Sequence, residues 1–261
     1  MTIHYGPPGA LDFDALVQQM PDDEFKNLTR STIPSLCWWS EALHAESARW
    51  EPLRSALELS PLATGQLCFE YQVKSYGRNK PSFTDAMFIS DGAAVAFEAK
   101  STERVYENVE KWLREKEDSA NAQGVLRHWL DMIGSQSDPL SPKKVGGCVY
   151  QMLHRTASVC SLRKDSRRLH VVHQIFQVDD VDHEQEYREA LKEFEAALGA
   201  TQRGISIWLA CVKTRRTEKF QQVSAEITSL PPDAIPMPVR QAVIAGGLFT
   251  FDPCVVEQLK S

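Results

Sequence analysis

The sequence predicts a mixed α/β fold in which one β-sheet lies between layers of helices. Apolar residues recur at helical spacing through 11–20 and 35–59. Short runs rich in β-branched and aromatic residues begin after Gly65, and helical spacing returns between the later runs. Helices and strands that alternate in this way favour a layered α/β architecture.

The first half of the chain is expected to run from helices into a sheet. Pro52 divides the longer helix over 35–59, because proline removes a helical hydrogen bond, and Pro61 marks its end. Strands are expected over 67–74, 83–90 and 93–100, with a loop over 76–82. Asp91-Gly92 between the last two strands predicts a tight hairpin, so these strands should be antiparallel neighbours.

The second half alternates helices with two more strands. Helices are expected over 102–117, 121–133, 143–159 and 182–198, strands over 169–178 and 204–213, and a loop over 134–142. Gly199 is a suitable stop for the last helix. The prolines of 231–238 predict an irregular C-terminal extension with one or two short helices. The whole chain, 1–261, is expected to form a single domain.

Composition and charge narrow the class of protein. A hydrophobic share of 43% and a charged share of 25% are typical of a folded, soluble domain. The net charge of -6 argues against a protein that coats nucleic acid through a general basic surface, whereas an enzyme needs only a local basic groove. Two basic clusters could line such a groove, but we interpret both as solvated loops. The first cluster is Arg163, Lys164, Arg167 and Arg168, and the second is Lys213, Arg215, Arg216 and Lys219.

The start of the chain and its cysteines indicate a cellular location. The first residues lack the basic start and apolar run of a secretory signal, and no apolar stretch is long enough to span a bilayer. We therefore expect a cytoplasmic protein with no membrane partner. The six scattered cysteines form no Cys-x-x-Cys pair, so we expect buried, reduced thiols.

Glu98 and Lys100 place charge within an apolar strand. Their side chains share one face, while that of Phe97 points to the other. The hairpin brings Asp85, at the start of the preceding strand, beside them. Two carboxylates suit Mg²⁺, which usually takes one or two protein carboxylates and completes its shell with waters and phosphate oxygens. The ion would lower the pKa of a water, and Lys100 would position it, help deprotonate it, or stabilise developing negative charge.

These residues resemble the motif of the PD-(D/E)XK nucleases, which have the restriction-endonuclease-like fold. The motif reads Pro81-Ser-Phe-Thr-Asp85, then twelve residues, then Glu98-Ala99-Lys100. The resemblance implies that Asp85 and Glu98 bind the metal and that Lys100 assists the attacking water. It also implies a mixed β-sheet flanked by helices over 34–212, with a helical extension over 1–33 and the irregular one over 213–261 outside this core.

Three further positions are weaker parallels. Gln151 is similar to the polar residue, frequently glutamine, that the family places on the helix after the third strand, and the resemblance implies a catalytic role for it. Glu70 is similar to an additional metal-site carboxylate of some relatives, and Glu41 is an alternative for that place. The long insertion between Lys100 and Lys143 departs from the pattern and leaves open which helix packs across the site.

The function that the resemblance implies is magnesium-dependent hydrolysis of phosphodiester bonds, by a DNA endonuclease of restriction, repair or defence. Mn²⁺ is the alternative ion, RNA the alternative substrate, and a homodimer the assembly that such enzymes often form. The rival is a non-catalytic nucleic-acid- or protein-binding module of the same fold. A third reading is an accidental triad, because about one Glu-x-Lys triplet is expected by chance in such a chain. It would be favoured if Asp85 and Glu98 lay far apart, and in it Glu98 and Lys100 merely reach solvent at the strand end or pair with one another.

Two other pairs of residues have plainer interpretations. His154 and Arg155 could grip a phosphate, but we interpret them as residues of a helix surface. His170 and His173 lie three apart on a strand and therefore face opposite sides, which makes them a poor metal pair.

Overall fold

The computed structural model describes residues 2–5, 11–44, 49–59, 64–74, 76, 81–116, 119–134, 139–164, 167–179 and 183–260. Pro61, the middle of the loop expected over 76–82, part of the loop expected over 134–142, and Asp182 at the start of an expected helix lie outside these residues. No helix in the described part of the chain is both long and apolar enough to cross a membrane.

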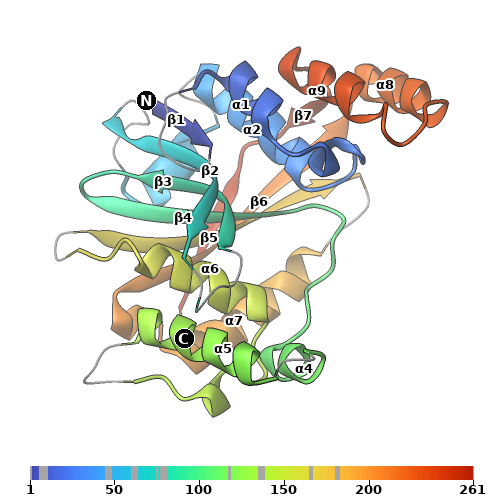
Figure 1. Cartoon of the computed structure of the whole chain (residues 1–261). Helices are drawn as coiled ribbons and strands as arrows, with labels where there is room; N and C mark the ends of the chain where they lie inside the picture. Colours follow the sequence, from blue (N-terminus) through green and yellow to red (C-terminus); the bar gives the residue numbers. More distant parts are fainter. Residues whose placement is uncertain are drawn as a thin grey trace.

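A mixed sheet of eight strands forms the centre of the protein (Figure 1). Its strands are β1 (Thr2–Tyr5), β2 (Gln66–Val73), β3 (Ser82–Ile89), β4 (Ala93–Lys100), β5 (Arg168–Val178), β6 (Ile205–Arg216), β7 (Phe249–Phe251) and β8 (Val255–Leu259). They follow the order β1 to β7, and β8 pairs with β6 beside β7. β2, β3 and β4 pair antiparallel, whereas β4, β5 and β6 pair parallel. The mixed α/β class is confirmed.

One layer of helices covers the first face of the sheet (Figure 1). It contains α1 (Phe13–Gln19), α2 (Thr32–His44), α3 (Glu51–Ala56), α8 (Glu218–Thr228) and α9 (Pro236–Ile244). Trp39 of α2 packs edge-on against Phe97 of β4, with ring centroids 5.1 Å apart. Because side chains alternate along a strand, this contact turns Glu98 to the opposite face.

A second layer covers that opposite face (Figure 1). It contains α4 (Val109–Arg114), α5 (Ser119–Ile133), α6 (Tyr150–Cys160) and α7 (Glu184–Leu198). α6 contacts β3, β4 and β5. The small side chains of Ala94 and Ala96, which belong to this core, leave room for a helix to approach β4. α6 is therefore the helix that packs across the face carrying Glu98.

The central strands follow the sequence expectations closely. Each of the five expected strands is present within a few residues of its predicted bounds. The hairpin is confirmed by the β3–β4 register and by the Ser90 N–H, which donates to the Ala93 carbonyl at 2.9 Å. Gly199 ends α7 with a left-handed φ of 61°. All six cysteines are buried and free, as predicted.

Two expected helices are wrong in their extent. The helix expected over 102–117 is reduced to α4, and the helix expected over 143–159 begins only at Tyr150. The backbones of the two displaced segments pair with each other instead. The Val109 N–H donates to the Cys148 carbonyl at 2.9 Å, and the Tyr150 N–H donates to the Glu107 carbonyl at 3.2 Å. Tertiary hydrogen bonding has overridden local helix propensity here.

Both ends of the chain are more regular than expected. β1 is a strand that the sequence reading missed, and it pairs in parallel with the start of β2. The extension over 213–261 is not irregular, because β6 continues to Arg216 and is followed by α8, α9, β7 and β8. β8 completes the far edge of the sheet by pairing antiparallel with β6. The prolines of 231–238 are confined to the connection between α8 and α9 and to the first turn of α9.

Candidate active site

Asp85 and Glu98 face each other across neighbouring strands. The register pairs Met87 with Ala96 and Ala86 with Phe97, so one further step places Asp85 opposite Glu98. Regular pairing ends at this step, where Asp85 Oδ2 accepts the backbone N–H of Ala99 at 2.8 Å. That bond fixes the Asp85 carboxylate beside β4. The two carboxylates are therefore neighbours, and their separation does not favour the accidental reading.

The row of polar side chains continues onto the strands on either side. On β2, Glu70 falls between the residues paired with Ala86 and Thr84, and its φ of 49° interrupts the ladder there. On β5, His173 pairs with Glu98. His173 is fully buried, and neither ring nitrogen has a hydrogen-bond partner among the described residues. Four adjacent strands thus each contribute one ionisable side chain.

Arg155 of α6 binds both carboxylates of the site. Its Nε donates to Oε2 of Glu98, and its Nη2 lies 3.3 Å from Oδ1 of Asp85. Its Nη1 donates to the backbone carbonyl of Phe83 at the start of β3. The Arg155 side chain is only 8% exposed. One guanidinium therefore ties α6 to β3 and β4 at the point where the two carboxylates meet.

Lys100 completes the arrangement from the end of β4. Its Nζ lies 2.5 Å from Oε1 of Glu98 and 4.7 Å from the centre of the Tyr106 ring. Burial acts to lower the pKa of Lys100, but the charges of Glu98 and Asp85 outweigh burial and hold it above its usual value. Lys100 is therefore a cation at neutral pH. In this state it can stabilise negative charge but cannot accept a proton.

The three carboxylates differ in their protonation. Burial disfavours the charged form of Glu98, but Arg155 and Lys100 outweigh it and hold the Glu98 pKa well below its usual value. Burial and the Glu98 charge raise the pKa of Asp85 to about 6. Burial and the Asp85 charge raise the pKa of Glu70 to about 8. The three carboxyl groups thus outnumber the two cations, Arg155 and Lys100, and the excess of carboxyl groups lies on the β2 side of the site.

The comparison with protein families gives one match. The model of a family described as a domain of unknown function, DUF6946, matches residues 10–219, which is well over half of the 261-residue chain. The chain belongs to the DUF6946 family. The DUF6946 match includes the site residues on β2, β3, β4 and α6. No curated protein and no solved structure matches the chain.

The donor set of this DUF6946 domain was tested against the ion that the motif implies. No group of three His, Cys, Asp or Glu side chains in the described ranges is arranged to hold a metal ion. Mg²⁺ needs only one or two protein carboxylates, however, because it keeps several waters. Asp85 and Glu98 already share one cation, the guanidinium of Arg155. Asp85 and Glu98 therefore fit Mg²⁺, provided that the ion replaces the Arg155 guanidinium between the two carboxylates.

Three weaker candidates came from the sequence, Gln151, Glu70 and Glu41, and they differ in how near they lie to the row of ionisable side chains on β2, β3, β4 and β5. Gln151 is half-buried on α6, one helical turn before Arg155 and so on the same side of the helix. Glu70 belongs to the row itself. Glu41 lies on α2, in the opposite helical layer, where its Oε2 accepts from Nε of Arg49 at 2.9 Å. Glu41 is therefore separated from the site by the sheet.

Arg155 is the site residue of the DUF6946 domain that sequence reasoning missed. The interpretation of His154 and Arg155 as surface residues is wrong, because Arg155 is buried and the half-buried His154 stacks on Trp129 and contacts the Ser82 hydroxyl. The sequence contained one signal that Arg155 faces the protein interior. Arg155 lies three residues after Met152 in an amphipathic helix, so it falls on the apolar side that faces the sheet.

Proposed function

We propose that the chain is a magnesium-dependent nuclease of the PD-(D/E)XK kind that hydrolyses phosphodiester bonds in DNA. The observation that carries this proposal is that Asp85 and Glu98, from adjacent antiparallel strands, come within reach of a single cation, with Lys100 beside Glu98. A chance Glu-x-Lys triplet gives no reason for a third charged residue, fourteen positions away in the chain, to meet it.

The arrangement of the central elements supports the finer assignment to the restriction-endonuclease-like fold. After α2 and the short α3 come the antiparallel strands β2, β3 and β4, then α4, α5 and α6, and then β5, which is parallel to β4. The resemblance implies a core of a helix, three strands, a helix and another strand, and this order is matched when α3, α4 and α5 are taken as additions to the core. α2 and α6 cover opposite faces of these four strands (Figure 1).

Residues of the sheet and of α6 take distinct roles in the proposed reaction. Asp85 and Glu98 would hold Mg²⁺, or Mn²⁺ in its place, with Glu70 as a further carboxylate at the exposed side. The ion supplies a water of lowered pKa and neutralises charge on the phosphate. Lys100 and Arg155, both cationic, offset negative charge at the reacting phosphate. Gln151 would contact the substrate from α6.

One observation favours a non-catalytic binding module as the second candidate. Every carboxylate oxygen of Asp85 and Glu98 already contacts a donor, from Ala99, Lys100 or Arg155. A site whose charges are internally paired is stable without an ion. In this reading Arg155 stays in place, and the domain binds nucleic acid or protein without cleaving it.

The experiment that tests the nuclease compares the wild type with Lys100→Ala and Asp85→Asn on supercoiled DNA, linear DNA and RNA. Each protein is incubated with Mg²⁺, with Mn²⁺ and with chelator. Lys192→Ala, which removes an exposed lysine on α7, is the matched control. Thermal unfolding of each variant shows whether it is folded.

Cleavage that requires a divalent ion, persists in Lys192→Ala and is lost in the two folded site variants would support the nuclease. A wild type that cleaves none of the substrates but still binds nucleic acid would favour the binding module. Metal-dependent cleavage that survives both Lys100→Ala and Asp85→Asn would place the active site elsewhere. Loss of a single catalytic group of this kind lowers the rate by about a hundredfold or more.

A further inference from the structure

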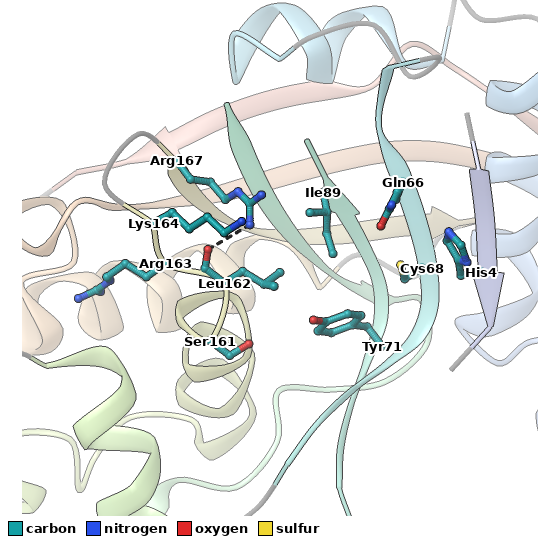
Figure 2. A pocket seen from close by; sticks show the side chains of 10 residues that line it. All are labelled: His4, Gln66, Cys68, Tyr71, Ile89, Ser161, Leu162, Arg163, Lys164 and Arg167. Atoms are coloured by element: carbon teal, nitrogen blue, oxygen red, sulfur yellow. Dashed lines mark hydrogen bonds between the residues drawn. The ribbon is translucent and has the colours of Figure 1, made fainter. Parts of the chain in front are cut away.

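A pocket opens between the start of β2 and the segment that follows α6 (Figure 2). Its volume is about 460 Å³. Ile89 and the buried Cys68 line it from the sheet, Tyr71 and Leu162 form apolar walls, and Lys164 and Arg167 reach in from the segment after α6. Glu70 of the row lies on β2 between the lining residues Cys68 and Tyr71, so this pocket adjoins the row of ionisable side chains along the same strand.

The polar side of the pocket is strongly cationic. Among the described residues that line it, three are lysine or arginine and none is aspartate or glutamate, although the chain as a whole carries a net charge of -6. Arg163 points away from the other two and donates to the Ile133 carbonyl at 3.2 Å. Lys164 and Arg167 lie together (Figure 2). Two adjacent cations in an acidic protein select a multiply charged anion.

Arg167 is held in place for such a ligand. Its Nη1 donates to the Leu162 carbonyl at 3.2 Å, which closes the turn after α6, while its Nε has no hydrogen-bond partner among the described residues. A guanidinium that is already positioned binds a phosphate with little further loss of side-chain freedom. Lys164, which is exposed, adds a mobile second charge.

The rest of the pocket suits a flat, aromatic group. The half-buried Tyr71 brings an aromatic ring to the lining beside the apolar side chain of Leu162, and the exposed Gln66 offers an amide donor and acceptor at the rim. Aromatic side chains bind nucleic-acid bases by stacking, and amides pair with base edges. A ligand that joins a base to a phosphate satisfies both sides of the pocket.

We infer that this pocket binds a phosphorylated nucleotide, with the base against Tyr71 and Leu162 and the phosphate at Lys164 and Arg167. The inference goes beyond the proposed nuclease and does not depend on it. The nucleotide has two sources, a free mononucleotide or the phosphorylated end of a strand. A second hollow, lined by Lys74 and Tyr76 among others, adjoins the pocket through Ser161, which lines both. This continuation gives a strand end further surface to contact.

Isothermal titration calorimetry with the full chain tests the inference. The titrations contain chelator and salt near 0.15 M, so that turnover is absent and distant charges are screened. The probes are AMP, adenosine, inorganic phosphate, and a short oligodeoxyadenylate with or without a 5′-phosphate. The variants are Lys164→Gln, Arg167→Gln and Tyr71→Leu. Lys192→Gln removes an exposed lysine of α7 that does not line the pocket, and it is the matched control.

AMP is expected to bind more tightly than adenosine or phosphate alone. Lys164→Gln and Arg167→Gln should each weaken AMP by about tenfold, as the loss of one charge-assisted hydrogen bond does. Tyr71→Leu should weaken AMP, but not phosphate, by roughly tenfold through lost stacking. Lys192→Gln should stay within about twofold of the wild type, because Lys192 does not line the pocket. If Arg167→Gln loosens its turn, as thermal unfolding would reveal, Lys164→Gln decides the phosphate contact.

Several results would overturn the inference. These are no binding of AMP or of the phosphorylated strand, binding that none of the three variants weakens, equal weakening by Lys192→Gln, or phosphate binding as tight as AMP binding. The strands separate the two sources. Tighter binding of the 5′-phosphorylated strand than of AMP supports the inference with a strand end as the ligand, and the reverse order supports it with a free nucleotide.

Discussion

Arg155 and Glu98 form an ion pair beneath α6, with side chains that are only 8% and 2% exposed. Lys100 takes the other oxygen of Glu98 at 2.5 Å, so one buried carboxylate is held between two cations. Removing one partner of a buried pair leaves an uncompensated charge in a medium of low dielectric constant. The pair therefore links the stability of the fold to the chemistry of the site.

Arg155→Ala is expected to lower the free energy of unfolding by about 3–5 kcal/mol, because it leaves Glu98 with Lys100 alone and unties α6 from β3. Urea denaturation measures the change. Glu98→Gln in the Arg155→Ala background serves as the control, since neutralising the orphaned carboxylate should recover part of the loss. Strictly additive effects of the two substitutions would contradict a direct interaction between these side chains.

The sequence was most informative where a pattern is local. The strand runs and the Asp91-Gly92 turn determine β3 and β4, because alternation and turn chemistry act over a few residues. The extended stretch before α4 depends instead on distant partners. The Tyr187 hydroxyl of α7 donates to the Arg104 carbonyl at 3.1 Å, and no local pattern reports such a contact. β1 and β8 are short strands whose pairing partners lie far away in the chain.

The same distinction applies to the site. Asp85, Glu98 and Lys100 could be brought together from the sequence, because one hairpin joins their strands. Arg155 could not, since its place follows from how α6 crosses the sheet after a long insertion. The charge of Arg155 predicted a place at the protein surface, and only its position among the apolar residues of α6 indicated that its side chain is buried.

Mg²⁺ is expected to stabilise the folded wild type, because the ion binds the folded state in preference to the unfolded one. At a free concentration about a hundredfold above its Kd, one bound ion adds about 2.7 kcal/mol. For a chain of this size that raises Tm by roughly 5–10 °C. Differential scanning fluorimetry with and without Mg²⁺ measures the shift, which Asp85→Asn should abolish.

Asp91→Asn, at the exposed hairpin turn, is the control and should keep the whole shift. An equal shift in Asp85→Asn would mean that the ion binds at another site. The absence of any shift in the wild type, together with a shift in Arg155→Ala, would show that the guanidinium and the ion compete for one place.

The contribution of Glu70 to stability is expected to fall as the pH rises from about 5 to 8. Glu70 has its pKa raised from 4.5 to about 8 in the folded protein, so over this window the folded state holds a proton that the unfolded chain has released. Stability falls with pH wherever the folded state binds more protons. Asp85, with its pKa raised to about 6, acts in the same direction. Glu98 acts oppositely, and its contribution is lost only as the solution becomes acidic. Three histidines also act in the opposite direction, because burial lowers their pKa values, to about 3 for His154 and to about 4 for His170 and His173.

Glu70→Gln should remove this contribution, because an amide neither gains nor loses the proton. Relative to Glu70→Gln, we expect the wild type to lose on the order of 2 kcal/mol between pH 5 and pH 8, after allowance for solvent screening of a half-buried group. Urea denaturation at several pH values measures both proteins. A difference in stability between the two proteins that stays constant across this window would show that Glu70 does not hold a proton in the folded state.

Trp39 is the residue through which the opposite layer supports the site. It is fully buried, and its ring packs at 4.9 Å from Trp38 and at 5.1 Å from Phe97, the residue next to Glu98. Trp39→Ala should lower the free energy of unfolding by about 3–5 kcal/mol, since it leaves a large cavity under β4. Trp39→Phe keeps an aromatic ring against Phe97 and should cost less. Phe83→Ala, at a position 38% exposed, is the control of similar chemistry and should cost least.

The same three variants separate support of the fold from support of the site. If Phe97 holds Glu98 in register, folded Trp39→Ala should also lose part of the stabilisation by Mg²⁺, because the Glu98 carboxylate is no longer fixed opposite Asp85. Trp39→Phe should retain it. A Trp39→Ala protein that is less stable yet responds fully to Mg²⁺ would show that Arg155 and Lys100 alone fix Glu98, independently of the core on the other side of the sheet.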